Sequence, residues 1–333
     1  MTVHYFKVDV RNVTEMYYDV ILSAIKKNGI EIKEHARCSY IQGLDIPKSD
    51  YILVTSVQYF LKLYVWGHRN FIYWFQGITP EECLMSTGSK FNYHLFSFIE
   101  KLALKTTKYK IGVSKYLFEH YEKKYRFKFK PDELFVMPCF NSVINKESFY
   151  YPQKYEKNIF CYAGGMQAWQ GFEDIVKIFK KMEKEDKQSF LKVLSKDKEG
   201  AKAVLEKYGI TRYSLNCVPQ EEMDNELAEC KFGFIIREDN IINNVATPTK
   251  LGTYIGNGVI PIFTPAVKAF VDLCKQYNYL CCVDYHNPME ALRPYLECRI
   301  SPNEISQAYQ KLYSEYYDKE MYIDKMSKFL TLI

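Results

Sequence analysis

The fold is indicated by one stretch near the middle of the chain, Ile159-Phe-Cys-Tyr-Ala-Gly-Gly165, in which an apolar run ends in two glycines. Its length and composition predict a buried β-strand followed by a tight turn. Apolar residues at helical spacing follow from Phe172 to Met182, and a second strand pattern runs from Ser189 to Leu194. Strand, helix and strand in this order predict a parallel sheet covered by helices.

The same alternation extends through the rest of the chain. In the first half, His4–Val10, Tyr51–Thr55 and Phe71–Phe75 have strand patterns, and Glu15–Lys27 has a helical one that stops at Asn28-Gly29. A chain of 333 residues is long enough for two domains of ordinary size. We therefore predict an α/β protein built from two Rossmann-like, doubly wound domains.

The domain boundaries follow from a change in composition. Asn145–Lys157 contains Pro152 and many charged residues, which is typical of an interdomain linker. We expect an N-terminal domain over residues 1–150 and a second domain over residues 151–315. Residues 316–333 are expected to form a C-terminal helix that could cross back to the first domain.

Composition excludes several classes of protein. The sequence is 47% hydrophobic and 26% charged, so it predicts a globular protein. Its ten cysteines contain no CxxC pair and its six histidines have no metal-ligand spacing. No metal site is expected. With no signal peptide and no apolar run of the roughly 20 residues that span a bilayer, we expect a cytoplasmic location, or a peripheral one at the inner face of the cell membrane.

Positive charge gathers in one segment. Residues 101–130 contain ten Lys or Arg residues and only two Glu residues, interleaved with Tyr and Phe. Basic and aromatic side chains together suit an anionic membrane surface, although a solvated helix and hairpin would have the same pattern. The net charge of the whole chain is +5 and no nucleic-acid module is present, so we expect no nucleic-acid partner.

Candidate binding residues follow the predicted strands of the second half. Gly164 and Gly165 would let a backbone approach a phosphate, and they would also suit a structural turn. Arg237 and Glu238 follow the strand Phe232–Ile236, where a solvated turn is the alternative. Thr247-Pro248-Thr249-Lys250 is typical of a helix start, with Thr247 as N-cap and Pro248 at the first helical position. The Thr249 hydroxyl and the Lys250 ammonium could then bind an anion. The alternative is a capped structural helix with a surface lysine.

These residues carry a family resemblance. The segment Arg237–Ile262, with its Pro248-Thr249-Lys250, resembles the nucleotide-sugar site of bacterial group 1 (family 4) glycosyltransferases. Tyr162–Gly171 is similar to their glycine loop, and the segment beginning Val218-Pro-Gln-Glu resembles their base-binding loop and helix. The resemblance implies a GT-B fold with two domains facing across a cleft, a nucleotide-sugar co-substrate, no required metal or other cofactor, and retention at the anomeric carbon.

The sequence departs from that family at several positions. Gly165 and Gln170 stand where the family has Arg and Lys, and Thr253 stands where it has a ribose-binding Glu. Glu238 could replace the family's sugar-contacting carboxylate. These departures are compatible with an altered sugar or with lost activity.

The first half offers candidates for the acceptor side. Gln76, Glu81 and Glu82 lie just beyond the strand Phe71–Phe75, where many relatives have a His. A carboxylate there could orient or deprotonate an acceptor hydroxyl, and it could equally cap a helix.

The sequence therefore predicts a glycosyltransferase, expected to transfer a hexose. It would move a sugar from a nucleotide-sugar to a glycan or lipid-linked saccharide in capsule or lipopolysaccharide synthesis. Glu81, Glu82, Gln76 and Glu238 are the catalytic candidates. Two alternatives stay open on the same fold: a non-catalytic protein that binds nucleotide-sugars or glycans, and a nucleotide-sugar epimerase.

Overall fold

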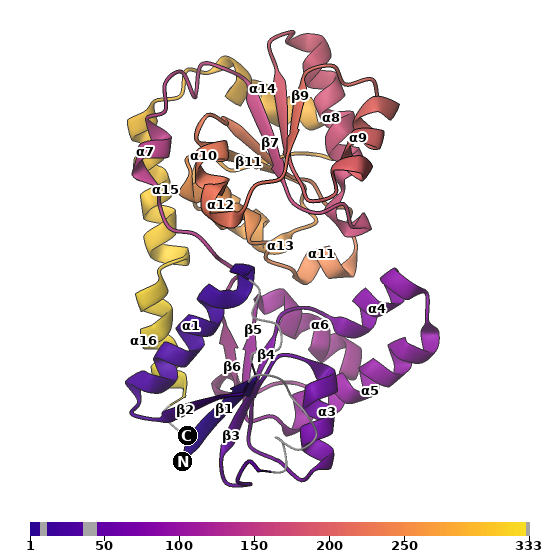
Figure 1. The fold of residues 1–333 in the computed structure, drawn as a ribbon, viewed down its shortest axis with the longest axis vertical. Coiled ribbons are helices and arrows are strands. Elements are labelled where there is room, and N and C mark those ends of the chain that lie inside the picture. Colours follow the sequence, from indigo (N-terminus) through magenta and orange to yellow (C-terminus); the bar gives the residue numbers. More distant parts are fainter. Residues whose placement is uncertain (7–11, 36–44, 331–333) are drawn as a thin grey trace. The chain divides into compact units, whose positions relative to one another are not determined.

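The computed structural model describes residues 1–6, 12–35 and 45–330, which form two compact units (Figure 1). Unit 1 takes in the described residues of Met1–Cys139, Val245–Thr247 and Asp318–Ile333. Unit 2 consists of Phe140–Asn244 and Pro248–Tyr317. The chain thus passes from unit 1 to unit 2 and returns to unit 1 at its C-terminal end.

Unit 1 is built on a parallel sheet with the strand order β2-β1-β3-β4-β5-β6. The strands are β1 (Thr2–Phe6), β2 (Glu31–His35), β3 (Tyr51–Val54), β4 (Phe71–Phe75), β5 (Tyr109–Gly112) and β6 (Leu134–Val136). All residues of β3 and β4 are buried, because helices cover both faces of such a sheet. This is why these strands are apolar throughout and do not alternate.

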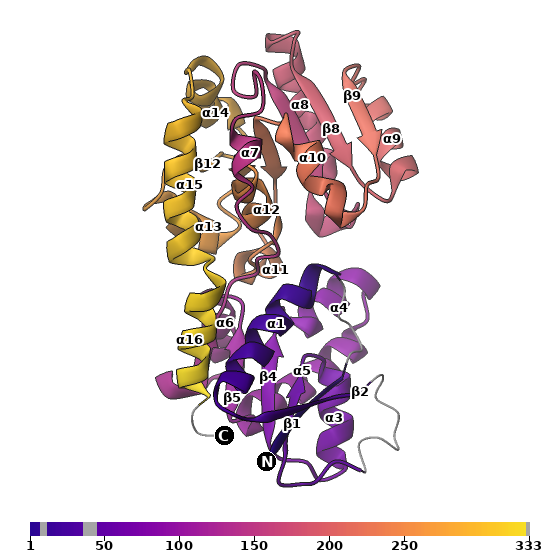
Figure 2. The ribbon, with the colours of Figure 1, turned by 60° about the vertical axis from the view of Figure 1, so that its left-hand side comes forward.

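Helices connect the strands of unit 1. They are α1 (Asn12–Lys27), α3 (Val57–Val65), α4 (Thr79–Thr87), α5 (Lys90–Thr106), α6 (Lys115–Tyr125) and the C-terminal α16 (Lys319–Phe329). Helix α16 packs beside α1, as Figures 1 and 2 show, and Asn28 Nδ2 donates to the carbonyl of Ser327 at 2.8 Å. Aromatic side chains fill the core between helix and sheet: Trp74 on β4 contacts Tyr17 and Tyr18 on α1 edge-on, with ring centroids 5.4 Å apart.

Unit 2 contains a second parallel sheet, with the order β12-β11-β10-β7-β8-β9. Its strands are β7 (Ile159–Ala163), β8 (Phe190–Leu194), β9 (Tyr213–Asn216), β10 (Phe232–Ile235), β11 (Ile260–Phe263) and β12 (Cys281–Cys282). Its helices are α7 (Lys146–Phe149), α8 (Phe172–Glu185), α9 (Lys198–Lys207), α10 (Met223–Ala228), α11 (Ile241–Val245), α12 (Lys250–Gly256), α13 (Lys268–Cys274), α14 (Pro288–Glu297) and α15 (Pro302–Tyr316). The prediction of two Rossmann-like α/β domains is confirmed.

The segment Asn145–Lys157, interpreted above as a linker, packs inside unit 2. Lys154 is 2% exposed, and its ammonium donates to the carbonyls of Ala228 at 2.8 Å and Asn257 at 2.7 Å. These carbonyls lie at the ends of α10 and α12, so Lys154 secures two helix ends.

Two predictions touch residues outside the described ranges. The strand predicted over His4–Val10 is described only as far as Phe6, and one of the ten cysteines counted above, Cys38, lies outside the described residues. Among the described residues, no helix combines the length and apolar character that a membrane span requires.

Candidate functional site

The strand order of unit 2 reverses direction between β7 and β10. The chain runs outward from β7 through β8 to β9, then returns to the other side of β7 and continues from β10 to β12. In such sheets ligands bind beyond the carboxyl ends of the two strands at the reversal. Gly164 and Gly165 follow β7, and Arg237 follows β10, so the sequence-predicted residues lie at that point.

Arg237 is held rigidly at this edge. Its backbone N–H donates to Thr264 Oγ1 at 3.0 Å, and the Thr264 hydroxyl donates back to the Arg237 carbonyl at 2.6 Å. The guanidinium is 5% exposed, donates through Nη1 to the carbonyl of Trp169, and leaves Nε buried without a partner among the described residues. Burial lowers the pKa of Arg237 to about 10, and the group remains a cation at neutral pH.

Lys250 reaches the same loop from the first residue of α12. Its Nζ lies 2.5 Å from Gln170 Oε1 and 4.4 Å from the centre of the Tyr162 ring. A Cβ at position 164 would come within 2.5 Å of Nζ, so only glycine fits there without moving the lysine. Gly171, at φ 64°, closes the loop where a Cβ would lie 2.6 Å from the carbonyl oxygen of Ile236.

The two cations have no carboxylate partner within the described part of the chain. Burial, and after it the charge of Arg237, lower the pKa of Lys250 well below its usual value. Desolvation and a like charge nearby disfavour the ammonium form of Lys250, and a bound anion would favour it again. The arrangement is suited to an anionic ligand with several oxygens, which would accept hydrogen bonds from both side chains.

The helix start predicted at Thr247-Pro248 is wrong. Helix α12 begins at Lys250 with Thr249 as N-cap residue, and it has only seven residues. The Thr247 hydroxyl instead accepts a hydrogen bond from the backbone N–H of Cys139 at 3.0 Å, inside unit 1. Because α12 begins three residues beyond Thr247, this hydroxyl does not cap it, and the anion-binding capacity here rests on side chains.

Three further candidates of unit 2 are Thr253, Val218 and Glu238. Thr253 is 7% exposed, and its hydroxyl contacts Asn141 Oδ1 at 3.0 Å and the Thr249 carbonyl at 3.4 Å. Val218 is half-buried in the loop after β9. Glu238 is exposed directly after Arg237, and its carbonyl accepts from Asn243 Nδ2 at 3.0 Å. The roles of these three residues stay predictions.

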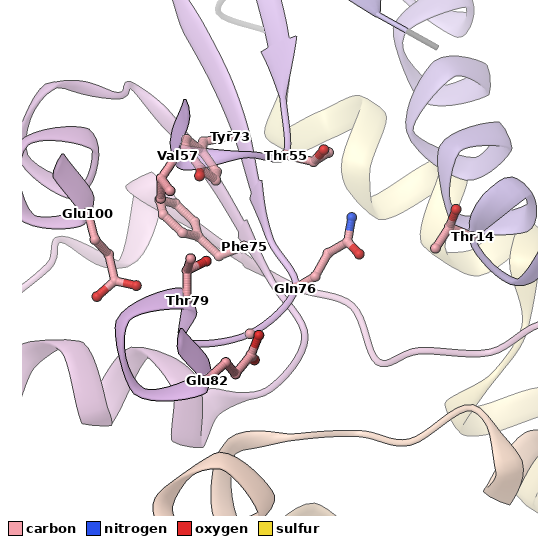
Figure 3. A pocket seen from close by; sticks show the side chains of 10 residues that line it. Thr14, Thr55, Val57, Tyr73, Phe75, Gln76, Thr79, Glu82 and Glu100 are labelled. Atoms are coloured by element: carbon pink, nitrogen blue, oxygen red, sulfur yellow. The ribbon is translucent and has the colours of Figure 1, made fainter. Parts of the chain in front are cut away.

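Unit 1 has a pocket of about 430 Å³ at the corresponding edge of its own sheet (Figure 3). It lies beyond the carboxyl ends of β3 and β4. Its lining combines hydroxyl, amide and carboxylate groups with aromatic side chains. The lining residues are Thr14, Thr55, Val57, Tyr73, Phe75, Gln76, Gly77, Thr79, Glu82 and Glu100. Gln76 and Glu82, predicted from the sequence, are therefore pocket residues.

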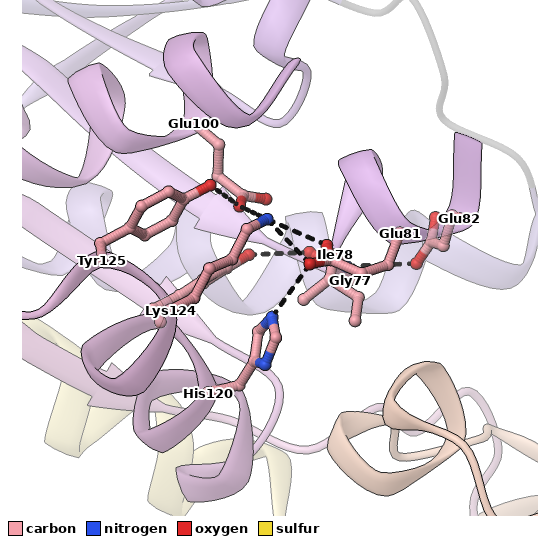
Figure 4. Close-up of polar contacts among 9 residues, drawn as sticks. Gly77, Ile78, Glu81, Glu82, Glu100, His120, Lys124 and Tyr125 are labelled. Atoms are coloured by element: carbon pink, nitrogen blue, oxygen red, sulfur yellow. Dashed lines mark hydrogen bonds and ion pairs between the residues drawn. The ribbon is translucent and has the colours of Figure 1, made fainter. Parts of the chain in front are cut away.

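Glu81 does not line this pocket, and Figure 4 shows it in an ion-pair network. Lys124 Nζ lies 2.9 Å from Glu81 Oε1 and 3.1 Å from Glu100 Oε2, and His120 Nε2 lies 3.4 Å from Glu81 Oε1. Burial opposes ionisation of Glu81, but His120 and Lys124 outweigh it and lower its pKa. Glu82 Oε1 accepts from the backbone N–H of Ile78 at 3.2 Å, which caps α4.

Glu100 is a functional candidate that sequence reasoning missed. It is 1% exposed, lines the pocket, and accepts hydrogen bonds from Lys124 Nζ at 3.1 Å and from the Tyr125 hydroxyl at 2.6 Å. Burial raises its pKa to about 7 in spite of both partners. A carboxyl that changes charge near neutral pH is suited to proton transfer. The one signal in the sequence is a lone carboxylate directly after the apolar residues Phe98 and Ile99.

The pKa of Glu100 predicts a pH-dependent stability. Between pH 4.5, its ordinary pKa, and about pH 7, Glu100 holds a proton in the folded protein that it loses in the unfolded chain. This proton binding stabilises the folded state, and the stabilisation is lost as pH rises through that window. We expect wild type to lose about 2 kcal/mol relative to Glu100→Gln between pH 5 and pH 8. Urea unfolding of both proteins measures this. A wild-type-to-variant difference that is constant with pH would show that Glu100 titrates normally.

The basic-aromatic segment 101–130 is only partly a surface. Tyr109, Phe118 and Tyr121 are at most 4% exposed, and Lys110 is buried with its ammonium 3.2 Å from Glu133. Lys124 belongs to the network above. These positions cannot belong to a surface of either kind, because β5 and the inner side of α6 turn these residues into the core of unit 1, and the membrane role of the segment stays a prediction.

Comparison with known proteins gives results at the level of structure. No family model matches the sequence, and no curated protein matches it significantly. The structure of HepE from Anabaena in complex with UDP and glucose covers 100% of both chains with a TM-score of 0.73, at 9% identity. The chain has the GT-B fold.

Other GT-B structures are similar over different shares of their length. Sucrose-phosphate synthase from Thermosynechococcus elongatus matches over 98% of both chains, with a TM-score of 0.69 and 10% identity. TarM from S. aureus, in complex with fondaparinux, alpha-GlcNAc-glycerol and UDP, matches 85% of this chain with a TM-score of 0.61 and 12% identity. The chain spans only 55% of the length of TarM. The predicted resemblance to GT-B glycosyltransferases is confirmed in structure.

Proposed function

We propose that this protein is a glycosyltransferase that binds the diphosphate of a nucleotide-sugar with Arg237 and Lys250. The observation that carries the proposal is the pair of basic side chains at the strand reversal of unit 2, next to Gly164. Arg237 is buried, Lys250 is half-buried with its pKa held well below the usual value, and neither has a carboxylate partner among the described residues. A diphosphate offers acceptor oxygens to both groups, and its developing charge as a leaving group would be stabilised there.

A metal ion is not needed in this proposal. Arg237 and Lys250 supply the positive charge that a divalent cation would otherwise bring to the diphosphate. The complexes of HepE and TarM with UDP lend support to a nucleotide ligand for this fold. We extend the proposal to residues 151–315 as the nucleotide-sugar domain, with Thr249, Thr253 and Val218 near the nucleotide and Glu238 near the sugar.

The acceptor is proposed to bind in the pocket of unit 1, in the N-terminal domain. Hydroxyl groups of Thr14 and Thr55, the amide of Gln76 and the carboxylate of Glu82 offer donors and acceptors for a saccharide. Tyr73 and Phe75, whose rings stack 3.9 Å apart, give an apolar wall. A free or lipid-linked saccharide of cell-surface polysaccharide synthesis fits this chemistry. Retaining hexosyl transfer rests on the family resemblance alone.

The test is turnover of nucleotide-sugars. The protein is incubated with a panel of UDP-, GDP- and ADP-sugars and saccharide acceptors, with and without EDTA, and free nucleoside diphosphate is measured together with product mass. We expect release with one nucleotide-sugar, unaffected by EDTA, and a product heavier by one sugar residue. Tight binding without release would favour the non-catalytic alternative. A nucleotide-sugar converted to an isomer of unchanged mass would favour the epimerase.

A further inference from the structure

Helix α5 carries a row of large apolar side chains on its outer face. Phe91, Leu95 and Phe98 lie at positions i, i+4 and i+7 and are 76%, 41% and 67% exposed. Met85, on the preceding helix α4, is 42% exposed. Figure 1 shows α4 and α5 as neighbouring helices at the edge of unit 1. Single exposed apolar residues are ordinary, but a helical stripe with two exposed Phe side chains marks a binding surface.

The same face is positively charged. Lys90, Lys101 and Lys105 are exposed along α5, and the only carboxylate of the helix, Glu100, is turned inward to Lys124. Every residue of helix α5 is described, so this excess of lysines over carboxylates holds for the entire helix. Apolar side chains flanked by lysines are the pattern of helices that lie in the interface of an anionic membrane.

We propose that the outer face of α5, formed by Phe91, Leu95 and Phe98 with Lys90, Lys101 and Lys105, docks onto a lipid bilayer that contains anionic headgroups. The Phe side chains enter the boundary of the acyl chains, and the lysines remain at headgroup level. This inference does not depend on the proposed transferase activity.

Charge favours a bilayer over a second copy of this chain. In a symmetric dimer the same patch appears on both partners, so the lysines of one α5 would approach those of the other. Like charges across an interface cost free energy, whereas anionic headgroups neutralise all three lysines. A lipid surface therefore satisfies both the apolar and the basic side chains.

Vesicle sedimentation tests the proposal with the full chain. Vesicles of phosphatidylcholine, with or without phosphatidylglycerol, are mixed with wild type, Phe91→Ser/Phe98→Ser, Lys101→Gln/Lys105→Gln and the control Lys123→Gln/Lys128→Gln. The control removes two exposed lysines of the same unit outside α5. We expect wild type to prefer anionic vesicles, and each α5 lysine to contribute about fivefold to the binding constant. Removing both Phe side chains should weaken binding by at least about tenfold.

Two outcomes would overturn the proposal. One is a failure of vesicle binding to depend on α5: wild type does not sediment with anionic vesicles, or the control variant loses as much binding as the α5 lysine variant. The other is a dimer in analytical ultracentrifugation that Phe91→Ser/Phe98→Ser converts to monomer while vesicle binding is unchanged. Because the substituted side chains are exposed, melting temperature and UDP affinity should match wild type, which separates this test from that of the proposed function.

Discussion

Lys250→Ala is expected to bind a nucleoside diphosphate about tenfold to 150-fold more weakly than wild type. A charge-assisted hydrogen bond contributes about 1.5–3 kcal/mol, and Lys250 is one of only two cations at the strand reversal in our account. The melting temperature should change little, because the ammonium has Arg237 beside it and no carboxylate that its removal would strand. Isothermal titration with UDP measures the affinity.

A buried, ion-paired lysine of unit 2, Lys192, provides the control. Lys192 Nζ lies 2.6 Å from Glu226 and 2.7 Å from Glu229, so it has the partners that Lys250 lacks. Lys192→Ala should lower the melting temperature and leave the UDP affinity of the folded protein near that of wild type. If Lys250→Ala instead lowers the melting temperature and keeps its UDP affinity, Lys250 is structural.

Lys124→Met should destabilise unit 1 by about 3–5 kcal/mol, the usual cost of removing one partner from a buried ion pair. Glu81 and Glu100 share this ammonium, and Glu100 is 1% exposed. The effect should be larger at pH 8 than at pH 6, since Glu100 can take up a proton below its pKa of about 7. At about 2–4 °C per kcal/mol, the unfolding transition should fall by roughly 10 °C, as measured by calorimetry.

The neighbouring residue gives the control for this prediction. Lys123 is exposed on the same helix, and Lys123→Met should leave the transition unchanged. Adding Glu100→Gln to Lys124→Met should recover part of the loss, because it removes the stranded carboxylate. Equal melting temperatures for the Lys123 and Lys124 variants would contradict the ion-pair network.

Much of the fold could be predicted because of how parallel sheets are buried. Strands such as Phe71–Phe75 and Phe232–Ile235 are apolar on both sides, and they stand out as continuous runs between helical patterns. The loops that carry chemistry come directly after them. Gly164 and Arg237 were recognisable for this reason before the strand order was known.

Side-chain partners distant in sequence could not be predicted. Glu100 and Lys124 pair across two helices, and nothing in either local pattern distinguishes this lysine from the exposed Lys123. Thr247 had the sequence context of a cap, but its hydroxyl is taken by Cys139, which is 108 positions away. Local propensity fails where a tertiary hydrogen bond competes for the same atom.

The membrane hypothesis shows the same limit. The density of Lys and aromatic residues in 101–130 suggested one surface, yet β5 and α6 bury Tyr109, Phe118 and Tyr121. In α5, before this segment, Phe91 and Phe98 are exposed. Composition could not show which side chains of this segment turn inward, because that depends on how β5 and α6 pack in unit 1.

The central claim is that the cations of unit 2 recognise a diphosphate, and one titration tests it most directly. UDP and uridine are each titrated calorimetrically into wild type and Lys250→Ala. The ratio of UDP affinity to uridine affinity gives the contribution of the two phosphates to binding. We predict that wild type prefers UDP over uridine and that this preference falls by about tenfold or more in the variant, with uridine affinity unchanged. An identical UDP-to-uridine ratio in both proteins would contradict the account.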